Sequence, residues 1–202
     1  MGIAIIGWGS LIWCPGALQI KTRWHPDGPV LPIEFARISR DGRLTLVIHS
    51  GSPRVRTYWA MSALDTLDAA QENLCIREGT ERKQIHAVDV NDEALATSSI
   101  ATVIRSWLRT QRNLEAAVWT GLGSNWETMR RSPFSPDDAI QYIAELKREQ
   151  EQATLRYDRA REYIENAPEQ IQTRVRTMLR ENGYKDAILP TILFEAKASE
   201  NP

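Results

Sequence analysis

A glycine-rich loop near the start of the chain has residue types and spacing suited to binding a ligand. Residues 3–6 are apolar and long enough for a buried strand, and Gly7 and Gly9 stand where that strand would end. Because glycine lacks a Cβ atom, a ligand can approach the peptide N–H groups of such a turn closely. Residues 7–16, which we call the first loop, therefore predict a binding site, although an ordinary β-turn beside a core strand explains the same pattern.

Two common motifs do not fit the first loop. A dinucleotide-binding G-x-G-x-x-G needs a third glycine where Ile12 stands, and apparent hairpins follow instead of a βαβ unit. Ser10 is outside a G-x-S-x-G elbow, and no pattern places a histidine near it, so a hydrolase triad has little support. The histidines are scattered singly and the cysteines lack C-x-x-C spacing, so we expect no metal site, no cofactor and reduced thiols.

Composition limits the class of protein. A chain of 202 residues suits one domain, with or without an appendage, and 42% hydrophobic with 25% charged residues is ordinary for a globular protein. A net charge of −1 argues against a broad nucleic-acid footprint. The apolar start is broken by glycine and serine well short of the roughly 20 residues that span a bilayer. We therefore expect a cytoplasmic protein with neither a nucleic-acid nor a membrane partner.

Strands are expected to follow the first loop. Residues 33–38 and 43–49 flank the pair Asp41-Gly42, which is a strong hairpin signal, and residues 54–61 predict one further strand.

A helix is expected to come next, and it carries the second group of interest. Ser62 and Asp65 have capping-box spacing, leucines recur at helical intervals after them, and Gly79 stands where a helix would end. Glu78 would then lie in the last turn. Its neighbour Arg77 is expected to point elsewhere, toward solvent-side acids.

Further elements complete the first part of the chain. Residues 84–90 and 116–119 predict strands, and residues 94–111 predict an amphipathic helix between them. Residues 119–126 contain two glycines between two tryptophans, which could wall a pocket, although tryptophans beside a turn are at least as often structural.

The last third of the sequence is helical and charged. Ser135 is a good N-cap, and an apolar seam with heptad-like spacing predicts one long helix that continues to Pro168, with a second helix closing at residues 182–183. We divide the chain into an α/β domain over 1–132, a helical extension over 133–184 and a tail over 185–202. Docking of the extension on its own domain is favoured, which gives a monomer, and a weak homodimer through these helices is the alternative.

Two segments resemble a known family. The residues GWGSLIWCP at 7–15 resemble the G-Y-G-S-L-I-W-x-P opening of ChaC-type proteins, which belong to the γ-glutamylcyclotransferase-like family. Leu67-Asp68 and then REG at 77–79 follow in the order of that family's L-D helix and R-E-x-G segment. The resemblance covers about the first 80 to 90 residues.

The resemblance implies a fold and a reaction. The fold would be α+β, a small mixed β-barrel with flanking helices, to which the C-terminal helices are added. The enzyme would release 5-oxoproline from a γ-glutamyl-amine or γ-glutamyl-peptide, with Glu78 as general acid and base. Trp8, Gly9, Ser10 and Leu11 would bind the substrate, the last three through backbone N–H groups that hold its α-carboxylate. The amine attack closes a five-membered ring, a geometry that favours an intramolecular reaction.

A second interpretation keeps the fold without the catalysis. Trp8 replaces the family's tyrosine, and the G-T-P-like segment expected between the two motifs is absent, with HSGSP at residues 49–53 in its place. The chain would then be an inactive or regulatory small-molecule-binding module whose C-terminal helices dock a protein partner.

Overall fold

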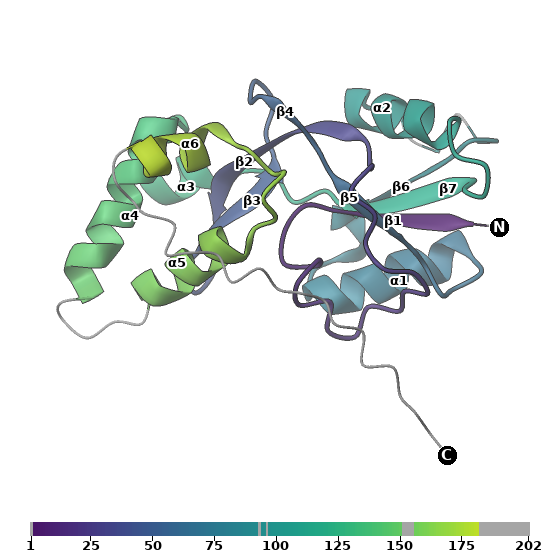
Figure 1. Ribbon diagram of the computed structural model, residues 1–202, viewed down its shortest axis with the longest axis horizontal. Helices are drawn as coiled ribbons and strands as arrows, with labels where there is room; N and C mark the ends of the chain where they lie inside the picture. Colours follow the sequence, from purple (N-terminus) through teal and green to yellow (C-terminus); the bar gives the residue numbers. More distant parts are fainter. Residues whose placement is uncertain (1, 93, 96, 151–155, 182–202) are drawn as a thin grey trace, which may run out of the picture.

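The first loop projects from the centre of a four-stranded sheet. The computed structural model describes residues 2–92, 94–95, 97–150 and 156–181 (Figure 1). The first sheet has the order β5-β1-β7-β6, and its strands are β1 (Ile3–Gly7), β5 (Tyr58–Met61), β6 (Ile85–Asp89) and β7 (Ala116–Thr120). Strand β1 is parallel to β7 and antiparallel to β5. Every residue of β1 is buried, as the apolar run predicted.

A second sheet lies beside the first. It has the order β3-β2-β4 and consists of β2 (Val30–Ile38), β3 (Leu44–Ile48) and β4 (Arg54–Arg56). The predicted hairpin is confirmed: β2 and β3 are antiparallel, and the turn between them contains Gly42 at a φ of 82°, which favours glycine.

The single strand expected over 54–61 is wrong, because the chain changes sheets in the middle of it. Thr57 separates β4 from β5. Its buried hydroxyl donates a hydrogen bond to the carbonyl oxygen of Pro29 at 2.7 Å, and this fixes the point where the chain leaves one sheet for the other. The two sheets are therefore joined by covalent continuity at Thr57.

Helices cover both faces of the first sheet. Helix α1 (Leu67–Glu78) lies on one face and α2 (Ser99–Leu108) on the other (Figure 1). The side chains of β1 alternate accordingly: Ile5 packs in the apolar cluster of α1, and Ile6 packs in the cluster of α2. Both helices start later than predicted, since α2 is capped by Ser98.

The N-cap of α1 was also predicted wrongly, whereas its end was predicted correctly. Thr66 rather than Ser62 accepts the capping hydrogen bond, from the N–H of Ala69 at 3.3 Å. Gly79 adopts a left-handed conformation at φ 57° and closes the helix. Glu78 is thus the final helical residue. A short 3-10 turn, η1 (Arg82–Gln84), leads from there into β6.

The C-terminal helices gather near the second sheet (Figure 1). They are α3 (Trp126–Arg130), α4 (Pro136–Gln150), α5 (Arg156–Asn166) and α6 (Arg174–Glu181). The predicted N-cap is confirmed, because the hydroxyl oxygen of Ser135 accepts a hydrogen bond from the N–H of Asp138 at 3.1 Å.

The expected long helix is wrong: α4 ends at Gln150, and α5 begins at Arg156 and packs against α4. Folding the chain back lets both apolar stripes join one cluster; its members include Ile143, Leu146, Ala160 and Ile164 with Phe35 of β2. Ala153 of the predicted seam and the predicted helix end at residues 182–183 lie outside the described residues.

A buried carboxylate ties α6 to the second sheet. Glu34 of β2 is fully buried and accepts hydrogen bonds from the N–H groups of Arg174 at 2.9 Å and Val175 at 3.4 Å. These are N–H groups in the first turn of α6, where a negative charge is favoured. The contact holds α6 against the second sheet.

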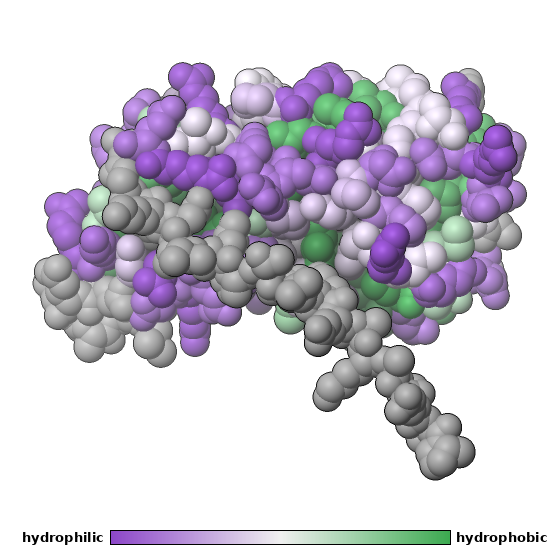
Figure 2. Space-filling model, in the orientation of Figure 1, coloured by the Kyte–Doolittle hydropathy of each residue, from purple (hydrophilic) through white to green (hydrophobic). Residues whose placement is uncertain are grey.

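The α+β class is confirmed, with two sheets and six α-helices among the described residues. Within those residues the strands do not form a closed barrel. None of the described helices combines the length and the apolar composition needed to cross a bilayer. Polar residues predominate on the face shown in Figure 2.

Candidate active site

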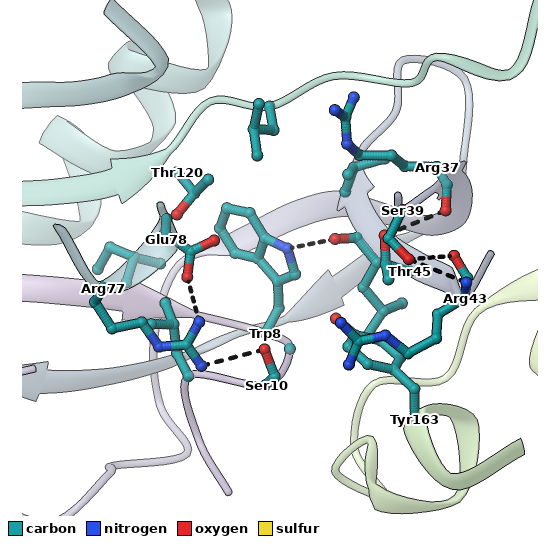
Figure 3. A pocket seen from close by; sticks show the side chains of 16 residues that line it. Trp8, Ser10, Arg37, Ser39, Arg43, Thr45, Arg77, Glu78, Thr120 and Tyr163 are labelled. Carbon is teal, nitrogen blue, oxygen red and sulfur yellow. Dashed lines mark hydrogen bonds and ion pairs between the residues drawn. The ribbon is translucent and has the colours of Figure 1, made fainter. Parts of the chain in front are cut away.

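The first loop opens onto a cavity of about 230 Å³ at the meeting point of the two sheets. The cavity is lined by the first loop, the β2–β3 hairpin, the ends of α1 and β7, and α5 (Figure 3). The structure brings together in its wall every residue that the sequence singled out for the site: Trp8, Gly9, Ser10, Leu11 and Glu78.

Glu78 is a partly buried carboxylate at the cavity wall. As the last residue of α1 it stands just before Gly79, and its side chain is only 18% exposed. Burial raises the pKa of the Glu78 carboxyl, and the Arg77 guanidinium, whose Nη1 lies 2.9 Å from Oε1, partly opposes this rise. A carboxyl group with a raised pKa is suited to exchange protons with a bound molecule.

Arg77 was predicted to point elsewhere, and this is wrong. Besides its ion pair with Glu78, the guanidinium donates to the Ser10 hydroxyl at 3.3 Å and to the Cys14 carbonyl oxygen at 2.5 Å. A further bond reaches the Pro15 carbonyl oxygen at 3.3 Å. The planar guanidinium can donate in several directions at once. Arg77 therefore fastens the first loop to the end of α1, next to Glu78.

Three N–H groups of the first loop take no part in the backbone hydrogen bonds that close its turn. Its turn is closed by the N–H of Ile12, which donates to the Gly9 carbonyl oxygen, and by that of Cys14, which donates to the Ser10 carbonyl oxygen. The N–H groups of Gly9, Ser10 and Leu11 have no backbone acceptor within the described residues. The N–H of Ser10 faces the Tyr163 hydroxyl, so the N–H groups of Gly9 and Leu11 are the donors of this turn that remain suited to hold an anion.

Trp8 forms the floor of the cavity. The side chain is buried, and its indole N–H donates to the Leu46 carbonyl oxygen on β3 at 3.3 Å. Figure 3 shows the indole between Glu78 on one side and Arg43 on the other. Trp8 thus links the first loop to the second sheet.

The cavity has a basic side that the sequence did not reveal. Arg37 and Arg43 line it from β2 and from the β2–β3 turn. Arg37 donates to the Gly123 carbonyl oxygen at 2.8 Å, and burial lowers its pKa. Arg43 forms an ion pair of 2.9 Å with Asp41. Neither residue belongs to a motif, and only the folding of the hairpin brings them opposite Glu78.

The segment at 119–126 contributes to the cavity, but not through its indoles. Thr120 and Leu122 line the cavity. Trp119 and Trp126 are each 1% exposed and pack in the apolar core. The structural interpretation of the two tryptophans is therefore correct.

Tyr163 of α5 reaches the first loop from the helical extension. A Cβ atom placed on Gly9 would lie 2.6 Å from the Tyr163 hydroxyl, so the two groups are in direct contact. Burial, the larger effect, raises the pKa of Tyr163 to about 12, although hydrogen bonding to the backbone of Leu46 and Ser10 opposes the rise. This contact could not be predicted from sequence patterns, because Tyr163 is far from the first loop along the chain.

No group of three or more His, Cys, Asp and Glu side chains placed to hold a metal ion occurs in the part of the chain that the structure describes. Comparisons of the chain with family models, curated proteins and solved structures find no match. The cavity offers a carboxylate with a raised pKa, N–H donors of the first loop and a basic side. Together these groups can bind a zwitterionic or anionic small molecule and move a proton on it.

Proposed function

We propose that the protein releases 5-oxoproline from a γ-glutamyl-amine or γ-glutamyl-peptide, as the γ-glutamylcyclotransferase-like family does. The observation that carries this proposal is that Glu78 and residues 9–11 of the first loop line one cavity. A general acid and base beside an anion-binding turn is what an attack of the α-amine on the γ-carbonyl requires.

In the proposed reaction, the N–H groups of the first loop hold the substrate's α-carboxylate. Glu78 takes a proton from the α-ammonium group, and the freed amine attacks the γ-carbonyl carbon to form the new C–N bond. The old C–N bond then breaks, and Glu78 returns the proton to the leaving nitrogen. The second proton lost by the attacking nitrogen passes to the leaving amine in the same way. The products are 5-oxoproline and the released amine in its protonated form.

The proposal extends to the fold and the setting. The family's mixed barrel would correspond to the two sheets that Thr57 joins here, and the protein would act in the cytoplasm as a monomer or weak homodimer. Continuity of β4 with β5 supports the first part.

A second candidate function is a binding module without catalysis. It is favoured by Tyr163, whose hydroxyl contacts the first loop where the α-carboxylate would bind. In that case the cavity would bind γ-glutamyl compounds without turnover.

Substitution of Glu78 separates the two candidates. Glu78→Gln keeps the shape of the side chain but cannot exchange the proton, so 5-oxoproline release from a panel of γ-glutamyl compounds should fall by about 100-fold or more. Glu81→Gln is the matched control, because Glu81 pairs with Lys83 on the exposed surface. Release by Glu78→Gln at the wild-type rate would refute the role of Glu78, and binding of these compounds without any turnover would favour the second candidate.

A further inference from the structure

Thr120 has a buried hydroxyl group that is not satisfied by the protein. It is the last residue of β7 and is 9% exposed, and its Oγ1 has no hydrogen-bond partner within the described residues. The other buried threonines differ: the Thr57 hydroxyl donates to Pro29, and that of Thr173 accepts from the N–H of Arg176. A buried polar group without a partner is unfavourable, so its presence needs a reason.

The unsatisfied hydroxyl belongs to a residue that lines the same cavity as the proposed acid and base. Thr120 lines the cavity that contains Glu78, and Figure 3 shows both side chains on the same side of the Trp8 indole. The topology explains this placement. Because β1 and β7 are parallel neighbours, their carboxyl ends meet at one edge of the sheet, and the first loop leaves from that edge.

We propose that Thr120 is a substrate-binding residue whose hydroxyl oxygen accepts a hydrogen bond from the α-ammonium group of the γ-glutamyl substrate. The inference rests on the proposed function and identifies a further contact in the same site. An ammonium nitrogen carries three N–H groups, so it can donate to Glu78 and to Thr120 together. The hydroxyl thereby holds the attacking nitrogen beside the carboxylate, which restricts its approach to the γ-carbonyl.

The other groups that line the cavity support the choice of the α-ammonium group as the partner of Thr120. The N–H groups of the first loop and the guanidinium groups of Arg37 and Arg43 are donors, and they suit the carboxylates of the substrate. The substrate's cation needs acceptors instead. Glu78 and Thr120 provide acceptor oxygens on one side of Trp8 (Figure 3). The side chains of Ile6 and Leu122, which also line the cavity, are apolar.

The experiment compares two probes that differ only in the α-amine. L-Glutamine is the simplest γ-glutamyl amide, and glutaramate is the same molecule without its amine. Calorimetric titration of the full chain should show that Thr120→Val weakens binding of L-glutamine about tenfold and leaves that of glutaramate unchanged. Valine has nearly the shape of threonine, and no internal hydrogen bond is lost, so the melting temperature should not fall.

Thr57→Val is the matched control. It removes a hydroxyl that bonds to Pro29 outside the cavity, so it should lower the melting temperature and leave the affinity for both probes unchanged. Thr120→Ser keeps the hydroxyl and should bind L-glutamine nearly as the wild type does. If Thr120→Val does not fold, Thr120→Ala is measured in its place.

Each outcome decides the inference. An unchanged affinity for L-glutamine in Thr120→Val overturns it, and so does an equal loss for both probes, which would indicate a change of cavity shape. If one of these two results is obtained while the wild type releases 5-oxoproline or binds L-glutamine, only the role of Thr120 is refuted, and the proposed function stands. If the wild type neither binds the probes nor releases 5-oxoproline, the proposed function and the inference fall together.

Discussion

Burial and the neighbouring guanidinium of Arg77 act on the pKa of Glu78 in opposite directions. Burial disfavours the charged form of the Glu78 carboxyl, and the positive charge of Arg77 favours it. The balance leaves the pKa of Glu78 above its ordinary value of 4.5. The proposed base must be ionised to accept a proton, so turnover should decline as the pH falls through this raised value.

Replacement of Arg77 should move that decline. Arg77→Met removes the positive charge while keeping an extended side chain, so the pKa of Glu78 should rise further. The acid limb of the profile of kcat/KM against pH should then shift to higher pH, whatever the height of the profile. Arg82→Met is the control, since Arg82 pairs with Asp68 and Glu72 on the surface. An acid limb at the wild-type position would show that Arg77 does not influence Glu78.

Among the elements, α6 is held partly by the buried carboxylate of Glu34, besides the packing of Val175 and Leu179 in the apolar core. Glu34→Gln preserves the size of the side chain but replaces one acceptor oxygen by a donor, which would face N–H groups of the α6 start. The free energy of unfolding should fall by about 1–3 kcal/mol, as measured by urea denaturation.

Glu181→Gln serves as the control, because Glu181 is exposed at the far end of the same helix. It should leave stability unchanged. Equal stability of Glu34→Gln and the wild type would show that the buried carboxylate does not hold α6.

The elements also show which sequence signals act locally. Gly79, Ser135 and the Asp41-Gly42 turn act within a few residues of the chain, and each prediction based on them is confirmed. The break at Thr57 was missed because its reason is a hydrogen bond to Pro29, which the sequence does not place nearby. The prediction of one long helix failed because the spacing of its apolar residues fits two packed helices as well as one.

At the scale of the whole molecule, only part of the candidate site could be predicted from the sequence. The first loop and Glu78 lie in short motifs, whereas Arg37, Arg43 and Tyr163 reach the cavity only through the packing of the hairpin and of α5. Their positions depend on contacts between distant segments, and no local spacing encodes those contacts.

The contact between Gly9 and Tyr163 joins the first loop to α5, which lies far from it along the chain. This contact can be tested directly. Gly9→Ala places a methyl group 2.6 Å from the Tyr163 hydroxyl, which should lower the free energy of unfolding by about 1–3 kcal/mol. Tyr163→Phe removes that oxygen and leaves the nearest ring atom at 3.7 Å, an ordinary contact.

The double variant should therefore be more stable than the sum of the two single losses allows. A cycle of urea denaturation measurements on the four proteins gives this coupling. Strict additivity would mean that the tyrosine moves aside when the loop is enlarged.

The place of Tyr163 also has a consequence for biosynthesis. The first loop and Glu78 leave the ribosome early, and the residue that closes their cavity from α5 follows only after most of the chain has been translated. The cavity is therefore completed last. A nascent chain that has folded only its first sheet still lacks the wall of the cavity that Tyr163 of α5 provides.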